Sequence, residues 1–89
     1  MLIFQVTSVA PNQALGANIE KAYPSAYLQF APNVWFVADQ GVTTKEVTEK
    51  LGVIVGSPFS GVVVVKVETY FGLAATSTWE WFKVKSVGV

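Results

Sequence analysis

The sequence of 89 residues contains no cysteine, no histidine and no arginine, so that all six basic residues are lysines. Without cysteine there is no disulfide, thiolate nucleophile or iron–sulfur cluster, and without cysteine and histidine the usual zinc sites cannot form. The absence of histidine also excludes a Ser-His-Asp triad and removes the side chain that titrates near neutral pH. We therefore expect no cofactor and no bound metal, and predict that the protein is not an enzyme.

Charge and long apolar runs are scarce as well. Six acidic residues balance the six lysines, so the formal net charge is zero. A neutral chain without arginine attracts phosphate backbones weakly and lacks the bidentate fork that recognises phosphate or guanine, so we do not expect a nucleic-acid partner. The valine run Val62 to Val65 is far shorter than the ~18–20 residues of a membrane span, and Met1 to Phe4 do not resemble a secretory signal. We expect a cytoplasmic protein that does not enter a membrane.

What the chain does contain is apolar, since 52% of its residues are hydrophobic and 13% are aromatic. Its length predicts a single domain over residues 1–89, and folding at this size buries only about 60–65% of the unfolded surface. Stability is then marginal or shared with a second subunit, which makes self-association an early expectation.

The first half of the sequence predicts a strand, a helix and a hairpin. Residues 2–8 are rich in β-favouring side chains and read as a strand. From Asn12, apolar residues follow a helical stripe that includes Leu15 and Ile19 and ends before Pro24. Two aromatic and β-branched runs, 25–31 and 34–39, flank Pro32-Asn33 and predict an antiparallel hairpin that is bulged or splayed at its tip.

The second half opens with the clearest local signal in the chain. Thr43-Thr44-Lys45-Glu46 has the form of a capping box, which predicts a helix over residues 44–51 that Gly52 terminates. Residues 62–68 then read as a central strand whose valines are covered on both faces or by a partner, while Lys66 and Glu68 open one face to solvent at its far end. The tail from Tyr70 is ambiguous, because residues 79–85 fit either a helix or an edge strand; we favour a short helical turn followed by an extended end.

The predicted order of strand, helix, strand, strand, helix, strand is that of a ferredoxin-like α+β domain, βαββαβ, with a C-terminal extension. In such a domain two helices cover one face of an antiparallel four-stranded sheet. The opposite face is then bare, and a chain this rich in apolar side chains needs something to cover it.

The element order and several aromatic positions resemble a known family. Trp35-Phe36-Val37 followed by Thr43-Thr44-Lys45-Glu46, a very apolar strand over 61–67, and Trp79 or Trp81 near the C-terminus are similar to the ferredoxin-like proteins related to the small CRISPR-associated endonuclease of spacer acquisition, including the SinR-like short bacterial proteins. The resemblance implies the same fold and a homodimer. The nucleases of this family have an aspartate at the end of the first strand, where a pair across the dimer holds a divalent cation.

At that place this sequence has Val6-Thr7-Ser8-Val9, without a carboxylate. Because the aspartate of the nucleases is missing at this position, the resemblance does not extend to nuclease activity. A divergent metal-dependent nuclease or nucleic-acid-binding protein of this family is the alternative function. It would draw on Asp39, Glu68 or Glu80, which we interpret instead as solvated strand ends and loop residues.

Other candidate chemistry has ordinary explanations. Ser8 and Ser57 have no base to activate them, so turn or cap hydrogen bonds explain them better than a nucleophilic role. Gly52 and Gly56 lack the Gly-Lys-Ser/Thr ending of a phosphate-binding loop, and a helix C-cap followed by a turn accounts for both.

Aromatic residues are more numerous than one small core absorbs, and some of them are expected to anchor an interface. We predict that the interface residues are Trp35, Tyr70, Trp79 and Trp81, with no catalytic and no metal-binding residue. The sequence thus predicts a homodimer or small homo-oligomer that acts as a protein-interaction module of unknown cellular role, with the bare sheet face and the tail forming the contact.

Overall fold

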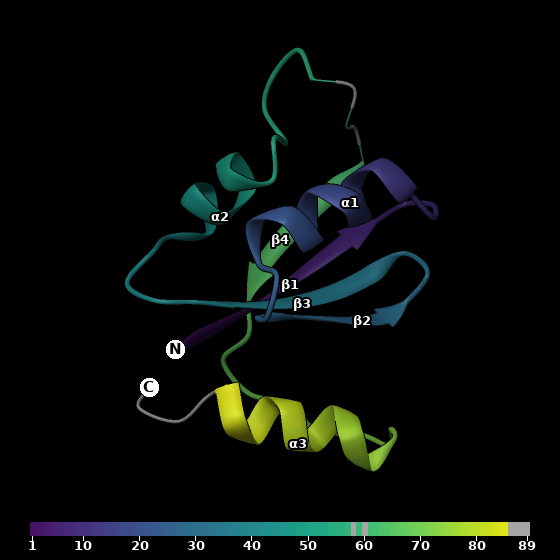
Figure 1. Cartoon of the computed structure of the whole chain (residues 1–89), viewed down its shortest axis with the longest axis vertical. Coiled ribbons are helices and arrows are strands. Elements are labelled where there is room, and N and C mark those ends of the chain that lie inside the picture. The colour runs from purple at the N-terminus through teal and green to yellow at the C-terminus, as the bar shows by residue number, and fades with distance from the viewer. Residues whose placement is uncertain (58, 60, 86–89) are drawn as a thin grey trace.

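The computed structural model describes residues 1–57, 59 and 61–85. The elements in this part of the chain follow one another in the order β1 (Leu2–Ser8), α1 (Gln13–Ala22), β2 (Tyr27–Ala31), β3 (Val34–Asp39), α2 (Thr44–Lys50), β4 (Val62–Lys66) and α3 (Thr76–Lys85) (Figure 1). The predicted strands and the first two helices are all present, with ends that differ by a few residues at most. None of the helices in the described ranges is long and apolar enough to cross a membrane.

The strands form one four-stranded sheet in the order β2-β3-β1-β4, and every neighbouring pair is antiparallel. β1 is central, and its register runs from Leu2 opposite Asp39 to Thr7 opposite Val34 on one side. On its other side β1 pairs with β4, from Phe4 opposite Lys66 to Ser8 opposite Val62. The α+β class with an antiparallel four-stranded sheet is therefore confirmed. The prediction of a central strand over residues 62–68 is wrong, because β4 pairs with β1 alone among the described strands and lies at an edge of the sheet.

The core lies between one face of the sheet and helices α1 and α2, which Figure 1 shows above the strands. Side chains alternate across each strand, so that one set points to these helices and the other to the opposite face. The indole of Trp35 packs beneath α1 at Gly16, where an added Cβ would lie 3.5 Å from its Cζ2 atom. The buried cluster consists of Phe4, Val6, Leu15, Ile19, Tyr23, Trp35, Val37, Val47 and Leu51.

Both core helices begin at the caps that the sequence predicts. The Asn12 side chain accepts a hydrogen bond from the Leu15 amide at 3.0 Å. The capping box of α2 is complete, because the Thr43 hydroxyl accepts from the Glu46 amide and the Glu46 carboxylate accepts from the Thr43 amide, each at 3.1 Å. These bonds satisfy amide groups that have no partner within the first helical turn.

The hairpin β2–β3 turns at Pro32-Asn33, and its register shifts between Gln29 and Ala31. This irregularity matches the predicted bulge near the tip. Asn33 also joins the turn to the end of β1, since its carbonyl accepts from the Ser8 amide at 2.9 Å and its side-chain amide donates to the Ser8 carbonyl at 3.1 Å. The turn is thereby held against the central strand.

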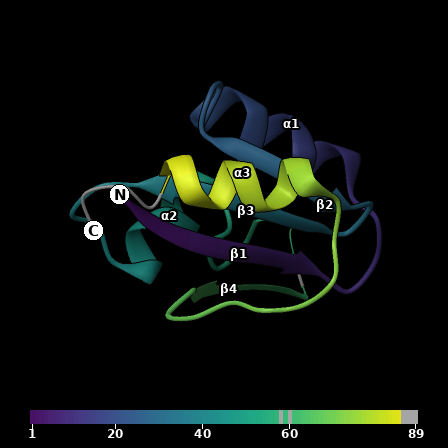
Figure 2. The same cartoon turned by 90° about the horizontal axis from the view of Figure 1, so that it is seen from below.

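The tail departs from the prediction. Residues 76–85 form a ten-residue helix, α3, which is longer than a short helical turn. It lies across the sheet face opposite α1 and α2 (Figures 1 and 2), so that this face is partly covered by the chain itself and is not bare as expected. The reason is packing, because Phe82 on α3 is buried against Phe36 on β3. The extended end predicted beyond this helix lies in residues 86–89, outside the described residues.

Candidate interaction surface

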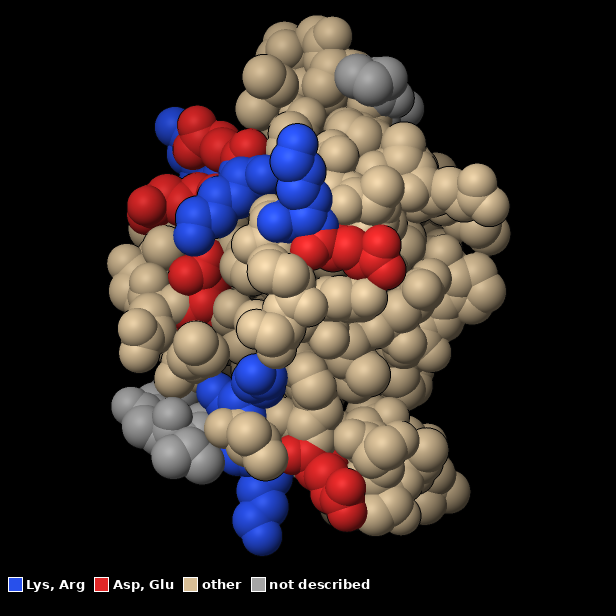
Figure 3. Space-filling model, viewed as in Figure 1, with Lys and Arg blue, Asp and Glu red and all other residues tan. Residues whose placement is uncertain are grey.

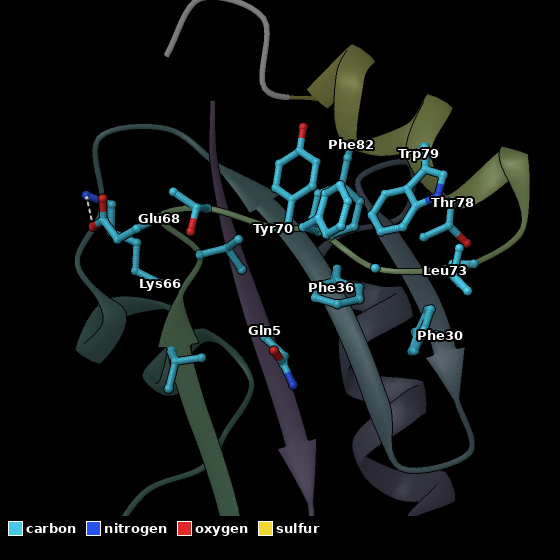
Figure 4. A pocket seen from close by; sticks show the side chains of 16 residues that line it. Gln5, Phe30, Phe36, Lys66, Glu68, Tyr70, Leu73, Thr78, Trp79 and Phe82 are labelled. Carbon is cyan, nitrogen blue, oxygen red and sulfur yellow. Dashed lines mark ion pairs between the residues drawn. The ribbon is translucent and has the colours of Figure 1, made fainter.

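Between α3 and the sheet lies a cluster of aromatic rings centred on Phe82, whose side chain is 2% exposed (Figure 4). The ring centroid of Phe82 lies 4.8 Å from that of Phe36 and 4.5 Å from that of Tyr70. Trp79 and Trp81 flank it at 6.1 and 5.5 Å. Edge-to-face contacts at these distances are favourable beyond simple burial, so the cluster fixes α3 on the sheet.

The four predicted interface residues fall into two groups. Tyr70, Trp79 and Trp81 come together around Phe82, and the rings of Tyr70 and Trp79 stack 6.0 Å apart. Tyr70 is exposed, and the two tryptophans are half-buried. Trp35 points to the other side of the sheet and is 2% exposed, so its ring belongs to the core and offers no surface to a partner.

A groove with a volume of about 520 Å³ runs between the sheet, α3 and the segment of residues 67–75 that connects β4 to α3 (Figure 4). Phe36, Phe82 and Trp79 line it from the sheet and from α3, while Gln5 and Thr78 are among its few polar side chains. The rim of the groove and the adjoining strand β4 carry large exposed apolar side chains, of which Tyr70 alone is among the predicted interface residues. We call the following residues the exposed apolar surface: Phe30, Val63, Val65, Tyr70, Phe71 and Leu73.

Phe71 and Leu73 are the extreme members of this surface, because both side chains are fully exposed. They flank Gly72, whose φ of 159° is compatible with extended backbone, in a segment without regular structure. An apolar residue on each side of a glycine in a loop was the one sequence signal that could have singled them out. On β4, Val63 is 60% and Val65 47% exposed, although the valine run predicted cover on both faces.

The charged side chains that border this surface are of both signs, since Lys66 and Glu68 line the same groove. On the face of the molecule drawn in Figure 3, acidic and basic residues lie close together and the rest of the face is uncharged. Lys66 at the end of β4 pairs with Glu68 at 3.4 Å, where both side chains are well exposed. On this face, therefore, neither sign of charge dominates among the described residues.

The carboxylates considered as metal ligands have other roles. Asp39 accepts hydrogen bonds from Lys50 Nζ at 2.6 Å and from the Tyr23 hydroxyl at 2.8 Å. Glu68 pairs with Lys66, and Glu80 is exposed on α3. Within the described ranges, no three His, Cys, Asp or Glu residues lie close enough together to hold a metal ion.

The ionisation of these groups follows their contacts. Partial burial raises the pKa of the Asp39 carboxyl, but hydrogen bonds from Lys50, Tyr23 and the Gln40 amide outweigh it and leave the pKa below its usual value. Burial raises the pKa of the Tyr23 hydroxyl, and the neighbouring Asp39 raises it further. The pKa of Tyr27 is raised mainly because its hydroxyl donates to the Glu20 carboxylate at 2.8 Å.

The serines and glycines considered as chemical sites have structural contacts. Ser8 is buried at the end of β1, where its backbone bonds Asn33. The Ser57 hydroxyl accepts from the amides of Ile54 and Phe59 at 3.4 and 3.3 Å, within a turn. Gly52 follows α2 with a φ of 78°, the left-handed conformation in which a helix C-cap favours glycine.

No protein-family model, curated protein or solved structure matches this chain.

Proposed function

We propose that this chain is a non-enzymatic, ferredoxin-like protein-interaction module of the cytoplasm that works as a homodimer or small homo-oligomer. The single observation that carries the proposal is the exposed apolar surface around the groove between the sheet, α3 and residues 67–75. The order of elements from β1 to β4 and the antiparallel sheet with β1 and β3 at its centre support the ferredoxin-like assignment. The last helix is then an addition to that arrangement.

The exposed side chains are large, so burying them in a contact contributes substantially to the free energy of association. Burying a side chain of the size of Phe or Leu contributes about 1.5–3 kcal/mol relative to leaving it in water. Phe71 and Leu73 contribute none of this in the isolated chain, and Val63 and Val65 contribute only part. In a symmetric contact between two copies, each of these residues is buried once in each copy. The free energy of association is therefore larger than one set of side chains would contribute.

A protein partner agrees with the charge better than nucleic acid does. The chain has zero formal net charge and no arginine, so that neither long-range attraction nor bidentate contacts favour phosphates. A neutral chain also does not repel its own copies. The alternative of a divergent nuclease has no carboxylate cluster to support it among the described residues.

Sedimentation equilibrium of the full chain at micromolar concentration tests the proposal. The expected mass is twice the 9.6 kDa of one chain, or a small multiple of it. Replacing Phe71→Ser together with Leu73→Ser is expected to shift the equilibrium toward the monomer, because both side chains then gain nothing from contact with a partner.

The matched control is Ile54→Ser with Val55→Ser. This pair is also exposed, but it lies in the loop between α2 and β4, at the end of the molecule opposite α3 (Figure 1). The control should leave the mass unchanged. A wild-type chain that sediments as a monomer overturns the proposal, and equal dissociation of the two double variants shows that the interface lies elsewhere.

A further inference from the structure

The free edge of β4 presents its backbone hydrogen-bonding groups to solvent. Among the described residues, β1 is the one strand that pairs with β4. At the two ends of this ladder, the Val67 amide donates to the Ile3 carbonyl at 2.9 Å and the Val9 amide donates to the Gly61 carbonyl at 3.0 Å. Residues of an antiparallel strand alternate between bonding one neighbour and facing the other side.

This alternation fixes which groups are free. Val63 and Val65 are separated from Gly61 and Val67 by even numbers of residues. Their amides and carbonyls therefore point to β1 and bond it, as those of Gly61 and Val67 do. The amides and carbonyls of the intervening residues therefore point away from the sheet. The residues with outward backbone groups are Val62, Val64 and Lys66.

Edge strands of monomeric proteins are commonly protected by proline, by several charges or by a bulge. β4 has four valines and one lysine, and its pairing with β1 runs without a register shift. Val63 and Val65 also leave their side chains exposed on the α3 side of the sheet. The strand therefore has the features of an edge that pairs with another strand.

A second copy of β4 fits this edge through a two-fold axis at Val64. Antiparallel pairing about that axis places Val62 opposite Lys66 of the partner and Val64 opposite its own copy, and each such pair exchanges two hydrogen bonds. Val63 then lies opposite the partner's Val65 with no hydrogen bond between them, which is the arrangement that brings side chains closest. In this register the outward backbone groups of Val62, Val64 and Lys66 all form hydrogen bonds with the partner.

Charge selects this direction of pairing. In the two-fold arrangement the two Lys66 residues lie at opposite ends of the seam, about 14 Å apart at ~3.4 Å per residue, which exceeds the Debye length of ~8 Å. Parallel pairing in register would instead place them side by side and repel them.

We propose that two copies of this chain join edge to edge through β4, in antiparallel register about Val64, to form one continuous eight-stranded sheet. This inference rests on the proposed homodimer and specifies its contact. The two sheet faces continue from one copy to the other, so both α3 helices lie on the same side of the joined sheet.

Disulfide trapping tests the register, because the natural chain contains no cysteine and introduced thiols are unique. In the proposed register positions 63 and 65 of opposite copies have Cα atoms about 4.5 Å apart, within the ~4.4–6.8 Å range of disulfides. The full-length double variant Val63→Cys/Val65→Cys should therefore form a covalent dimer under mild oxidation, visible on a non-reducing gel. Both positions are exposed, so the substitutions leave the core intact.

The single variants Val63→Cys and Val65→Cys are the matched controls. Each would have to bridge to its own copy along a diagonal of about 7–8 Å, so cross-linking should be roughly tenfold slower than in the double variant. Equal rates for a single variant and the double variant overturn the register. A wild-type dimer whose double variant does not cross-link overturns the edge contact but leaves the proposed function standing, whereas a wild-type monomer overturns both.

Discussion

At the scale of single residues, Asp39 connects three parts of the fold. It ends β3, accepts from Tyr23 at the end of α1 and pairs with Lys50 in the last turn of α2. The sequence identified Asp39 as an acidic residue without a helix partner, because its two side-chain partners lie 16 and 11 positions away. Contacts at such separations leave no local pattern in the sequence, whereas the capping box of Thr43 and Glu46 spans four residues and is readable directly.

Asp39→Asn is expected to lower the free energy of unfolding near neutral pH and to matter less in acid. The native contacts lower the pKa of this carboxyl, so the ionised form stabilises the fold above the unfolded pKa of about 3.9, and that contribution is lost as the pH falls through the native value. Urea unfolding at a series of pH values measures the difference between wild type and variant. A difference that stays constant down to acid pH would contradict this role. The control is Glu80→Gln, at an exposed position of α3, which should change the free energy of unfolding little at any pH.

Thr43→Ala should destabilise the protein by about 1 kcal/mol, because the Glu46 amide loses its acceptor at the start of α2. The control is Thr44→Ala, one residue inside the helix, where alanine is the better helix former and stability should be equal or slightly higher. Chemical denaturation of both variants measures the effect. Equal stability of the two variants would show that the cap contributes nothing.

At the scale of elements, α3 is the part of the fold that the sequence left open. Residues 79–85 combine Trp, Phe and Val with lysines in an order that fits helical and strand periods alike. The choice is made by Phe36 on β3, which together with Tyr70 forms the site into which Phe82 packs. A helix places Phe82 in that site with Trp79 and Trp81 around it, so the tertiary contact and not the local propensity decides the element.

Phe82→Ala is expected to cost about 3 kcal/mol and to loosen α3 from the sheet, since a buried aromatic ring is replaced by a cavity. Hydrogen exchange should become faster over residues 76–85 while α1 stays protected. Val84→Ala, on the exposed side of the same helix, should change stability by less than about 0.5 kcal/mol. Unchanged exchange in α3 after loss of the Phe82 ring would mean that other contacts hold the helix.

At the scale of the whole molecule, the sheet has two different faces and two different edges. α1 and α2 close one face, α3 covers part of the other, and the edge of β4 is left with valines and outward backbone groups. Self-association was expected from short length, high apolar content and zero charge. The location of the exposed apolar residues differs from the prediction, because α3 covers part of the face predicted to be bare, and these residues lie on β4, on β2 and in the segment of residues 67–75.

By itself the sequence determined the strands, the first two helices with their caps, the bulged hairpin and the absence of cysteine and histidine chemistry, because each of these depends on residues close together in the chain. The tertiary structure decided that the tail is a helix, that Trp35 lies in the core, and that Asp39 bonds Lys50 and Tyr23. It also decided that β4 is an edge strand, since the sequence of a valine-rich strand is the same whether it has one neighbour or two. Which backbone groups of that strand are free depends on its register with β1, and register exists only once the strands are paired.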